Sequence, residues 1–185
     1  NISAENLSLK QFPSGYSNLT YFLQSSSKQF VLRRPPFGAK SLQGGHDMLR
    51  EYNVLKNLKS QFSKVPDVFL YCDNNEILGA PFYLMERVEG YIIRPNLQQK
   101  DSPGSDIIQN VSKSLVSTLV ELHNVNIEKA NLKDLGNING YVKRQVEGWI
   151  KRYNHSKTDN ISNMDFISSW LYENQPSEVG SSIVH

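Results

Sequence analysis

Cysteine and long apolar runs are both scarce in this sequence, and each scarcity excludes a class of protein. Cys72 is the single cysteine among 185 residues, so neither an internal disulfide nor a cysteine-based metal site is available. This usage favours a reducing compartment, and we expect a cytoplasmic protein. No run approaches the roughly 20 apolar residues of a membrane helix, and the N-terminal stretch lacks a signal-peptide pattern. We therefore expect no membrane partner.

Excess charge of one sign is also lacking. The 20 basic and 18 acidic residues leave a net charge of +2, which is too small a field to hold a nucleic-acid backbone. We expect no nucleic-acid partner. An apolar content of 38% is sufficient for a core in one domain or in two small lobes.

A small polar segment with a glycine stands near the start of the chain, between predicted strands. Residues 19–24 and 29–34 are rich in β-branched and aromatic side chains and are separated by a short polar turn, which predicts an antiparallel strand pair. Alternation over 7–11 predicts a strand before them. The segment 13–18 contains Gly15 and leaves backbone N–H groups that could face an anion such as phosphate. An ordinary turn is the alternative interpretation.

Alternation along the second strand places Val31 and Arg33 on one face. An apolar side chain two positions before a cation, beside a glycine-containing segment, is the geometry of a nucleotide cleft, with Val31 against a base and Arg33 against phosphates. Arg34 competes with Arg33 for this role, and the alternation with Val31 is the reason to prefer Arg33. A solvated surface charge is the alternative.

The order of the later elements indicates an α+β protein. A helix is predicted from an N-cap at Asp47 through Lys59, and it carries Glu51. A strand over 68–72 and extended structure over 77–79 and 81–87 follow. Helices are then predicted from Ser102-Pro103 to His123, over 141–153 and over 164–173, with a strand beginning at Ser182. We divide the chain into an antiparallel-sheet lobe, 1–88, and a partial helical lobe, 89–185.

Glu51 is the candidate partner of the strand cation, because a carboxylate on the neighbouring helix commonly orients such a cation, as in the Lys–Glu pair of protein kinases. A solvated helix glutamate is the alternative. The backbone of Met85-Glu86-Arg87-Val88 could offer a donor and an acceptor to adenine in a kinase-like cleft. A buried edge strand is the alternative there.

Six motifs in order carry a family resemblance: SGYSNLTYFL, FVLRRPP, REYNVL, GAPFYLMERVEG, LVELHNV and GYVKRQVEGW. Together they resemble the aminoglycoside phosphotransferase and choline kinase-like superfamily, most closely the kinase-like domain at the N-terminus of certain acyl-CoA dehydrogenase family members. The resemblance implies a two-lobed protein-kinase-like fold. It also implies ATP and Mg²⁺ as cosubstrates, and phosphoryl transfer to a hydroxyl of a small molecule.

The resemblance implies roles for several residues. Gly15, Ser17 and Asn18 would cover the phosphates, Arg33 would contact them and pair with Glu51, and the main chain of Glu86 and Val88 would hold adenine. The usual strand cation of this superfamily is lysine, so the longer, planar guanidinium of Arg33 is a departure that changes how the cation sits.

The superfamily also has a catalytic loop, H-x-D-x-x-x-x-N, and a second metal-binding aspartate. Residues 182–185 resemble the strand leading into this loop, with His185 as its first residue, and a simple C-terminal tail is the alternative. On the first interpretation the hydroxyl-orienting aspartate and the Mg²⁺ ligands are not among residues 1–185. We therefore expect these residues alone to be inactive, and to be poorly soluble or partly unfolded.

Arg144 lies on one helix face with Tyr141 and Trp149 and is a weaker candidate for contact with an acidic substrate group. No histidine pair has metal-ligand spacing, and no metal ligand is assigned. The main interpretation is a small-molecule phosphotransferase. A nucleotide-binding or docking module without catalysis and a purely structural α+β domain stay open as alternatives.

Overall fold

The computed structural model of the protein describes most of the chain. The described residues are 7–13, 17–26, 28–38, 46–93, 103–137, 139–177 and 180–184. Within them, none of the helices combines the length and the apolar character needed to cross a bilayer.

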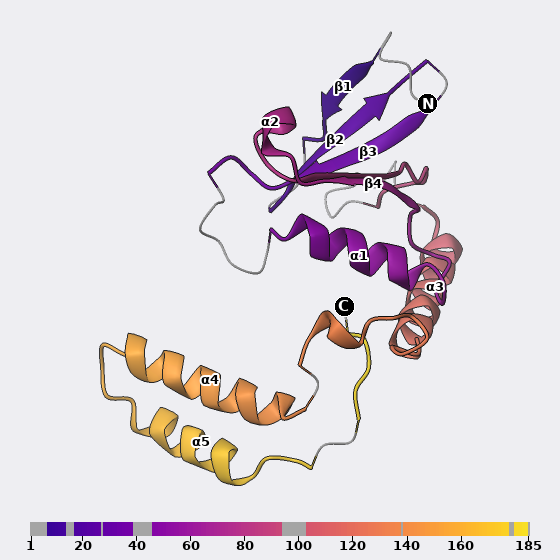
Figure 1. Cartoon of the computed structure of the whole chain (residues 1–185). Helices are drawn as coiled ribbons and strands as arrows, with labels where there is room; N and C mark the ends of the chain where they lie inside the picture. The colour runs from indigo at the N-terminus through magenta and orange to yellow at the C-terminus, as the bar shows by residue number, and fades with distance from the viewer. Residues whose placement is uncertain are drawn as a thin grey trace. The chain divides into compact units, whose positions relative to one another are not determined.

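A five-stranded antiparallel sheet forms the N-terminal part of the molecule (Figure 1). Its spatial order is β1-β2-β3-β5-β4, which places β3 at the centre. The strands are β1 (Ser8–Gln11), β2 (Leu19–Gln24), β3 (Gln29–Arg34), β4 (Val68–Cys72) and β5 (Phe82–Glu86). The strand pair predicted over 19–24 and 29–34 therefore has the predicted bounds.

One face of this sheet carries an apolar cluster. Leu32 of β3 lies opposite Leu84 of β5, and both are buried together with Phe82. Partly buried side chains from the neighbouring strands and from α2 (Asn75–Leu78) complete the cluster, namely Tyr21, Leu23, Cys72 and Leu78. Alternation then turns Val31, Arg33, Tyr83 and Met85 to the opposite face.

The extended structure predicted at 77–79 is wrong, because the short helix α2 occupies residues 75–78 and ends at Gly79. Asn74 caps it by accepting a hydrogen bond from the Glu76 N–H at 2.9 Å, and Gly79 ends it in the left-handed conformation with φ of 74°. The apolar pair at 77 and 78 suggested a strand, but an Asx cap before it and a glycine after it form a helical turn.

Helix α1 (Met48–Leu58) packs on the face of the sheet that carries Arg33 and Tyr83 (Figure 1). Its predicted N-cap is confirmed, because the Asp47 carboxylate accepts a hydrogen bond from the Arg50 N–H at 2.9 Å. Tyr52 lies on the inner side of the helix, with its ring 6.4 Å from that of Tyr83. This packing fixes the position of α1 relative to the strands, and with it the position of Glu51, one residue earlier on the helix.

The edge strand β4 contains an irregularity. Its register with β5 shifts between Val68 and Leu70, so that one residue, Phe69, is left out of the regular pairing. The ring of Phe69 meets that of Phe30 edge to face, with centroids 5.5 Å apart. A bulge of this type bends and twists a strand locally.

A second apolar cluster joins the end of α1 to the segment after α3 (Ser105–His123). Leu58, Phe62, Ala130 and Leu132 are buried in it, and Leu122 and Ile183 pack against it among other side chains. Lys64 also pairs with Glu121 of α3 at 2.7 Å.

Two sequence predictions in this region need correction. Helix α3 begins at Ser105, after an extended Gly104, rather than at Pro103. Residues 182–184 form no strand, because they pair with none of the strands in the described part of the chain. The β-branched pair there favoured a strand, but Ile183 instead packs against the apolar cluster.

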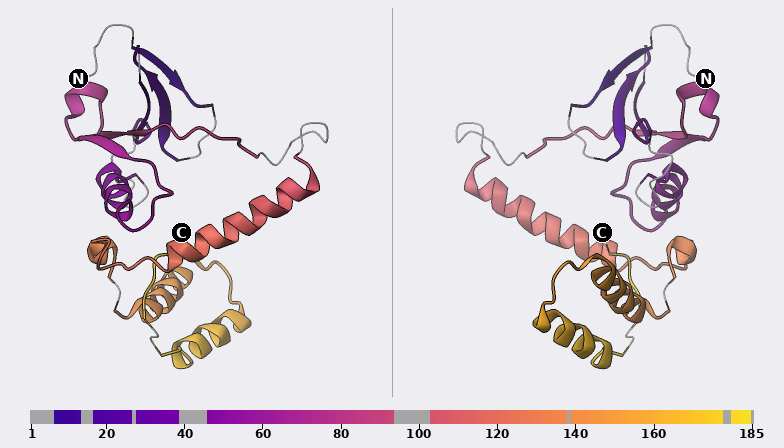
Figure 2. Two further views of the ribbon diagram at one scale, coloured as in Figure 1. Left: turned by 90° about the vertical axis from the view of Figure 1, so that its right-hand side faces the viewer. Right: turned by 90° about the vertical axis from the view of Figure 1, so that its left-hand side faces the viewer.

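Backbone contacts divide the chain into two compact units, Asn1–Leu132 with Ile183–His185, and Lys133–Ser182. The second unit contains a 3₁₀ turn over Lys133–Leu135 and the helices α4 (Tyr141–Ser156) and α5 (Ser162–Glu173), which lie side by side (Figure 2). The lobe boundary predicted at residue 88 stays a prediction.

Replacing the N-cap of α1 is expected to loosen the helix that carries Glu51. Asp47→Ala leaves the Arg50 N–H without its side-chain acceptor, and we expect it to lower the free energy of unfolding by about 1 kcal/mol. Denaturant unfolding measures this. Asp73→Ala is the matched control, because Asn74 rather than Asp73 caps the next helix. Equal losses from the two substitutions would contradict the prediction.

Candidate functional site

The carboxylate of Glu51 is the centre of the site. The Arg33 Nε lies 3.1 Å from Glu51 Oε2, and the two side chains are 29% and 30% exposed. The Arg33 Nη2 lies 3.5 Å from the other oxygen, Oε1. The Nε is buried and its N–H is not aligned for a hydrogen bond, so the contact is chiefly an ion pair. The structure thus brings the two predicted residues together, and their action on a nucleotide stays a prediction.

Two neutral donors also reach this carboxylate. The Tyr83 hydroxyl donates to Glu51 Oε2 at 3.0 Å, and the Asn18 Nδ2 donates to Oε1 at 2.7 Å. Tyr83 is 2% exposed, so its hydroxyl needs a partner inside the protein. Asn18, Arg33, Glu51 and Tyr83, which we call the Glu51 cluster, therefore join β3 and β5 to the residue before β2 and to α1.

The environment of Tyr83 favours its neutral form. Burial raises the pKa of Tyr83 above its ordinary value, and the negative charge and hydrogen bond of Glu51 raise it further. The positive charge of Arg33 acts in the opposite direction but is outweighed. The phenol therefore stays protonated and keeps donating to Glu51 wherever the protein is folded near neutral pH.

Strand register explains why Tyr83 belongs to the cluster. Tyr83 of β5 lies directly opposite Arg33 of β3, so both side chains project from the same face toward α1. Sequence reasoning missed Tyr83. The available signal was its place two residues before Met85 on a predicted strand, which puts these two side chains on one face.

Val31 lies on the same face as Arg33 and has apolar neighbours there. It is opposite Phe22 of β2 and Met85 of β5. The guanidinium of Arg87 lies 4.7 Å from the centre of the Phe22 ring. The face therefore offers an apolar surface of strand side chains beside the cation, and Phe22 is a member that sequence reasoning missed.

The end of β5 is braced against the segment before β4. The Glu86 N–H donates to the Asp67 carbonyl at 2.7 Å, and the Asp67 N–H donates to Glu86 Oε2 at 3.0 Å. Since this N–H is already used, Glu86 could offer adenine only its carbonyl oxygen. Val88 lies two residues beyond β5 and is exposed.

Arg34, the competing cation, points away from this site. Its Nε donates to the Pro35 carbonyl at 3.2 Å, and its guanidinium lies 4.1 Å from the centre of the Phe37 ring. Neither contact involves Glu51. The two arginines therefore turn to different partners, as the alternation along β3 predicted.

The remaining predicted residues are placed as follows. Gly15 and His185 lie outside the described residues. Ser17 is exposed, whereas Asn18 is buried with its side chain turned to Glu51 rather than to open space. Arg144 donates to the backbone carbonyls of Asn137 and Asn139, so its guanidinium is bound to the backbone that precedes its own helix.

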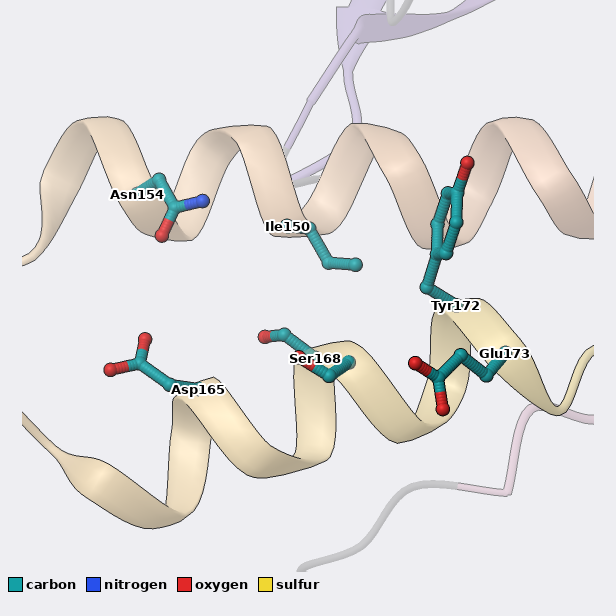
Figure 3. A pocket seen from close by; sticks show the side chains of 7 residues that line it. Ile150, Asn154, Asp165, Ser168, Tyr172 and Glu173 are labelled. Carbon is teal, nitrogen blue, oxygen red and sulfur yellow. The ribbon is translucent and has the colours of Figure 1, made fainter.

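A separate groove of about 340 Å³ lies between α4 and α5 (Figure 3). Asp165 and Glu173 lie toward its two ends, with Ser168 between them. Asp165 is already paired with Lys157 at 3.6 Å, so the groove is less anionic than its lining suggests. Within the described ranges no three His, Cys, Asp or Glu side chains gather to hold a metal ion.

The fold and this geometry together define a kinase-like class of α+β protein, in which a helix carboxylate faces a strand cation on an antiparallel sheet. Comparison with known proteins agrees. The sequence profile of a family described as "Phosphotransferase enzyme family" matches residues 8–185. The chain belongs to this phosphotransferase family.

Individual relatives are consistent with that assignment. The chain is 42% identical over 170 residues to rat acyl-CoA dehydrogenase family member 11 and 32% identical over 180 residues to mouse family member 10. These matches cover 92% and 97% of the chain but only 21% and 16% of those proteins. The chain thus spans about a fifth of the length of its curated relatives or less.

A solved structure shares the fold. The crystal structure of a predicted aminoglycoside phosphotransferase from Ralstonia eutropha superposes with a TM-score of 0.75 at 28% identity. The match covers 96% of this chain and 50% of that one. The α+β, kinase-like fold predicted from the sequence is confirmed by this likeness.

Removing the Tyr83 hydroxyl is expected to destabilise the fold in a pH-dependent way. Tyr83→Phe deletes one hydrogen bond to a charged acceptor, which is worth about 1.5 to 3 kcal/mol near neutral pH. The pKa of Tyr83 is raised in the folded state, so its stabilisation is fully present below 10.0, the ordinary value of a tyrosine, and is lost as the pH rises above it.

Denaturant unfolding from pH 7 to 11 tests this, with Tyr172→Phe as the matched control because Tyr172 is exposed. The difference in unfolding free energy between wild type and Tyr83→Phe should shrink above pH 10. A difference that stays constant with pH would contradict the expected protonation of Tyr83.

Proposed function

We propose that this chain forms the nucleotide-binding part of an ATP- and Mg²⁺-dependent phosphotransferase that acts on a hydroxyl group of a small molecule. The observation that carries the proposal is the Arg33–Glu51 ion pair of 3.1 Å, on the sheet face where Asn18 also donates to Glu51. Membership of the phosphotransferase family supports the reaction type. The acceptor hydroxyl and the use of ATP belong to the proposal.

The chemistry asks the protein for positioning and charge rather than for covalent participation. The transferred phosphoryl group carries negative charge on its oxygens, and a cation fixed in advance stabilises that charge without reorganising during the reaction. In this proposal Arg33 contacts the phosphates, and Glu51 prevents its guanidinium from turning away. The planar fork of an arginine presents paired N–H groups to two oxygens in a fixed geometry, whereas a lysine acts as a compact point charge.

The base is proposed to lie on the apolar surface beside Arg33. Val31, Phe22 and Met85 would contact one face of the adenine ring. The carbonyl of Glu86 would accept from the amino group of adenine, and the N–H of Val88 would donate to a ring nitrogen. The two hydrogen bonds between Glu86 and Asp67 would hold the end of β5 in a fixed position for contact with the base.

Mg²⁺ would neutralise charge on the bound phosphates. Within the described residues no side-chain cluster fits it, so its protein ligands are not assigned in this chain. The contribution of these residues is to bind and orient the nucleotide.

The proposal is tested on the full-length protein that contains this chain. Calorimetry with ATP and Mg²⁺ should show saturable binding, and Glu51→Gln should lower the rate of ADP formation by about tenfold to a hundredfold, because Arg33 loses the charge that aims it. Glu76→Gln is the matched control, since Glu76 is an exposed helix carboxylate on α2.

Absence of heat at millimolar ATP would overturn the proposal. ATP binding with no ADP formation in the presence of any hydroxylated acceptor would instead support a nucleotide-binding module without catalysis. A loss in Glu76→Gln as large as that in Glu51→Gln would show that the effect is not specific to the ion pair.

A further inference from the structure

Asn18 is the residue directly before β2, and it is 6% exposed. A buried side-chain amide needs partners for both its oxygen and its nitrogen. Both partners are present. The Nδ2 lies 2.7 Å from Glu51 Oε1, and the Oδ1 lies 2.6 Å from the Nδ1 of His46.

Chemistry dictates the direction of these hydrogen bonds. An ionised carboxylate only accepts, so the group of Asn18 that faces Glu51 must be the NH₂. The oxygen of the amide then faces His46, and an oxygen acceptor requires a proton on the Nδ1 of the ring. A directed chain of donors therefore runs from His46 through Asn18 to Glu51.

This series of hydrogen bonds matters because a carboxylate rotates easily. The terminal torsion of glutamate is broad, so a single bonded oxygen does not fix the plane of the group. The Tyr83 hydroxyl holds Oε2 at 3.0 Å. On Oε1, Asn18 at 2.7 Å is a much closer donor than the Arg33 Nη2 at 3.5 Å. Asn18 is therefore the donor that completes the orientation of Glu51.

We propose that Asn18 is a positioning residue of the phosphotransferase site, coupling the start of β2 to the Arg33–Glu51 ion pair, with His46 supporting the orientation of its amide. This inference rests on the proposed function. It differs from the role that the family resemblance implied, in which Asn18 covers the phosphates. In the structure the side chain is directed to the carboxylate, so Asn18 acts on the nucleotide through Glu51 and Arg33.

A kinetic double-mutant cycle in the full-length protein separates the two roles. Asn18→Leu keeps the branched shape of the side chain but removes both hydrogen bonds, and it should lower the rate of ADP formation from saturating ATP about tenfold. In a Glu51→Gln background the same substitution should lower the rate less than about twofold further, because the negative charge that Asn18 orients toward Arg33 is already absent. Asn53→Leu, on the exposed side of α1, is the matched control and should leave the rate unchanged.

Full multiplication of the two single losses in the double variant would overturn the inference, since Asn18 would then act independently of Glu51. His46 gives a second readout. His46→Gln retains an N–H donor and should keep most of the activity. His46→Leu leaves the Asn18 oxygen without its donor and should lower the activity, but less than Asn18→Leu, because the Asn18 NH₂ still donates to Glu51. Equal activity of the two His46 variants would contradict the assignment of His46 as the donor to Asn18.

Hydrogen–deuterium exchange tests the coupling without any turnover. Asn18→Leu should raise exchange in peptides from α1, and Glu51→Leu should raise exchange in peptides from β2, because each removes the hydrogen bond between residues 18 and 51 from one of its two ends. Exchange confined to the mutated element in both variants would overturn the coupling. If the wild-type protein binds no ATP, the proposed function fails, and this exchange experiment still decides whether Asn18 and Glu51 are coupled.

Discussion

A partly buried carboxylate that must be surrounded by donors is the constraint on which this part of the molecule depends. An exposed ion pair alone contributes about 0.2 to 1 kcal/mol, and the Arg33–Glu51 pair is only partly shielded from water. The contact between cation and carboxylate therefore does not hold α1 in place by itself. The neutral donors of Asn18 and Tyr83 add directional bonds to a charged acceptor, which are stronger than bonds between neutral groups. Glu51 thereby ties a helix to the sheet through β3, β5 and the residue before β2.

The parts of the site that were predictable depend on short-range periodicity. Alternation along one strand placed Val31 and Arg33 on a common face and separated Arg33 from Arg34, and the structure has this arrangement. Helical spacing after the Asp47 cap placed Glu51 in the first turn of α1. Each of these inferences spans only a few residues, over which the backbone geometry of a strand or helix is nearly fixed.

Tyr83 was not predictable in the same way, because its role depends on the register between β3 and β5. These strands are separated by α1, β4 and α2, and no local pattern specifies which residue of one lies opposite Arg33 of the other. The direction of the Asn18 side chain has the same origin, since its partner is 33 residues away. At 77–78 the local pattern was misleading, because a cap and a glycine beyond the apolar pair decided the conformation.

The bulge in β4 has a consequence for how the molecule behaves among other proteins. An edge strand presents unpaired backbone groups that can recruit a strand from another chain, and a regular, apolar edge is a template for aggregation. β4 forms one edge of the sheet, and its exposed Phe69 and Leu70 would make it such a template if its pairing were regular. The register shift next to Phe69 bends the strand locally, and the edge-to-face contact with Phe30 keeps the ring against its own sheet. The bulge in the edge strand thus hinders the pairing of strands from other molecules with this sheet. The central strand β3 keeps the regular geometry that places Arg33 opposite Tyr83.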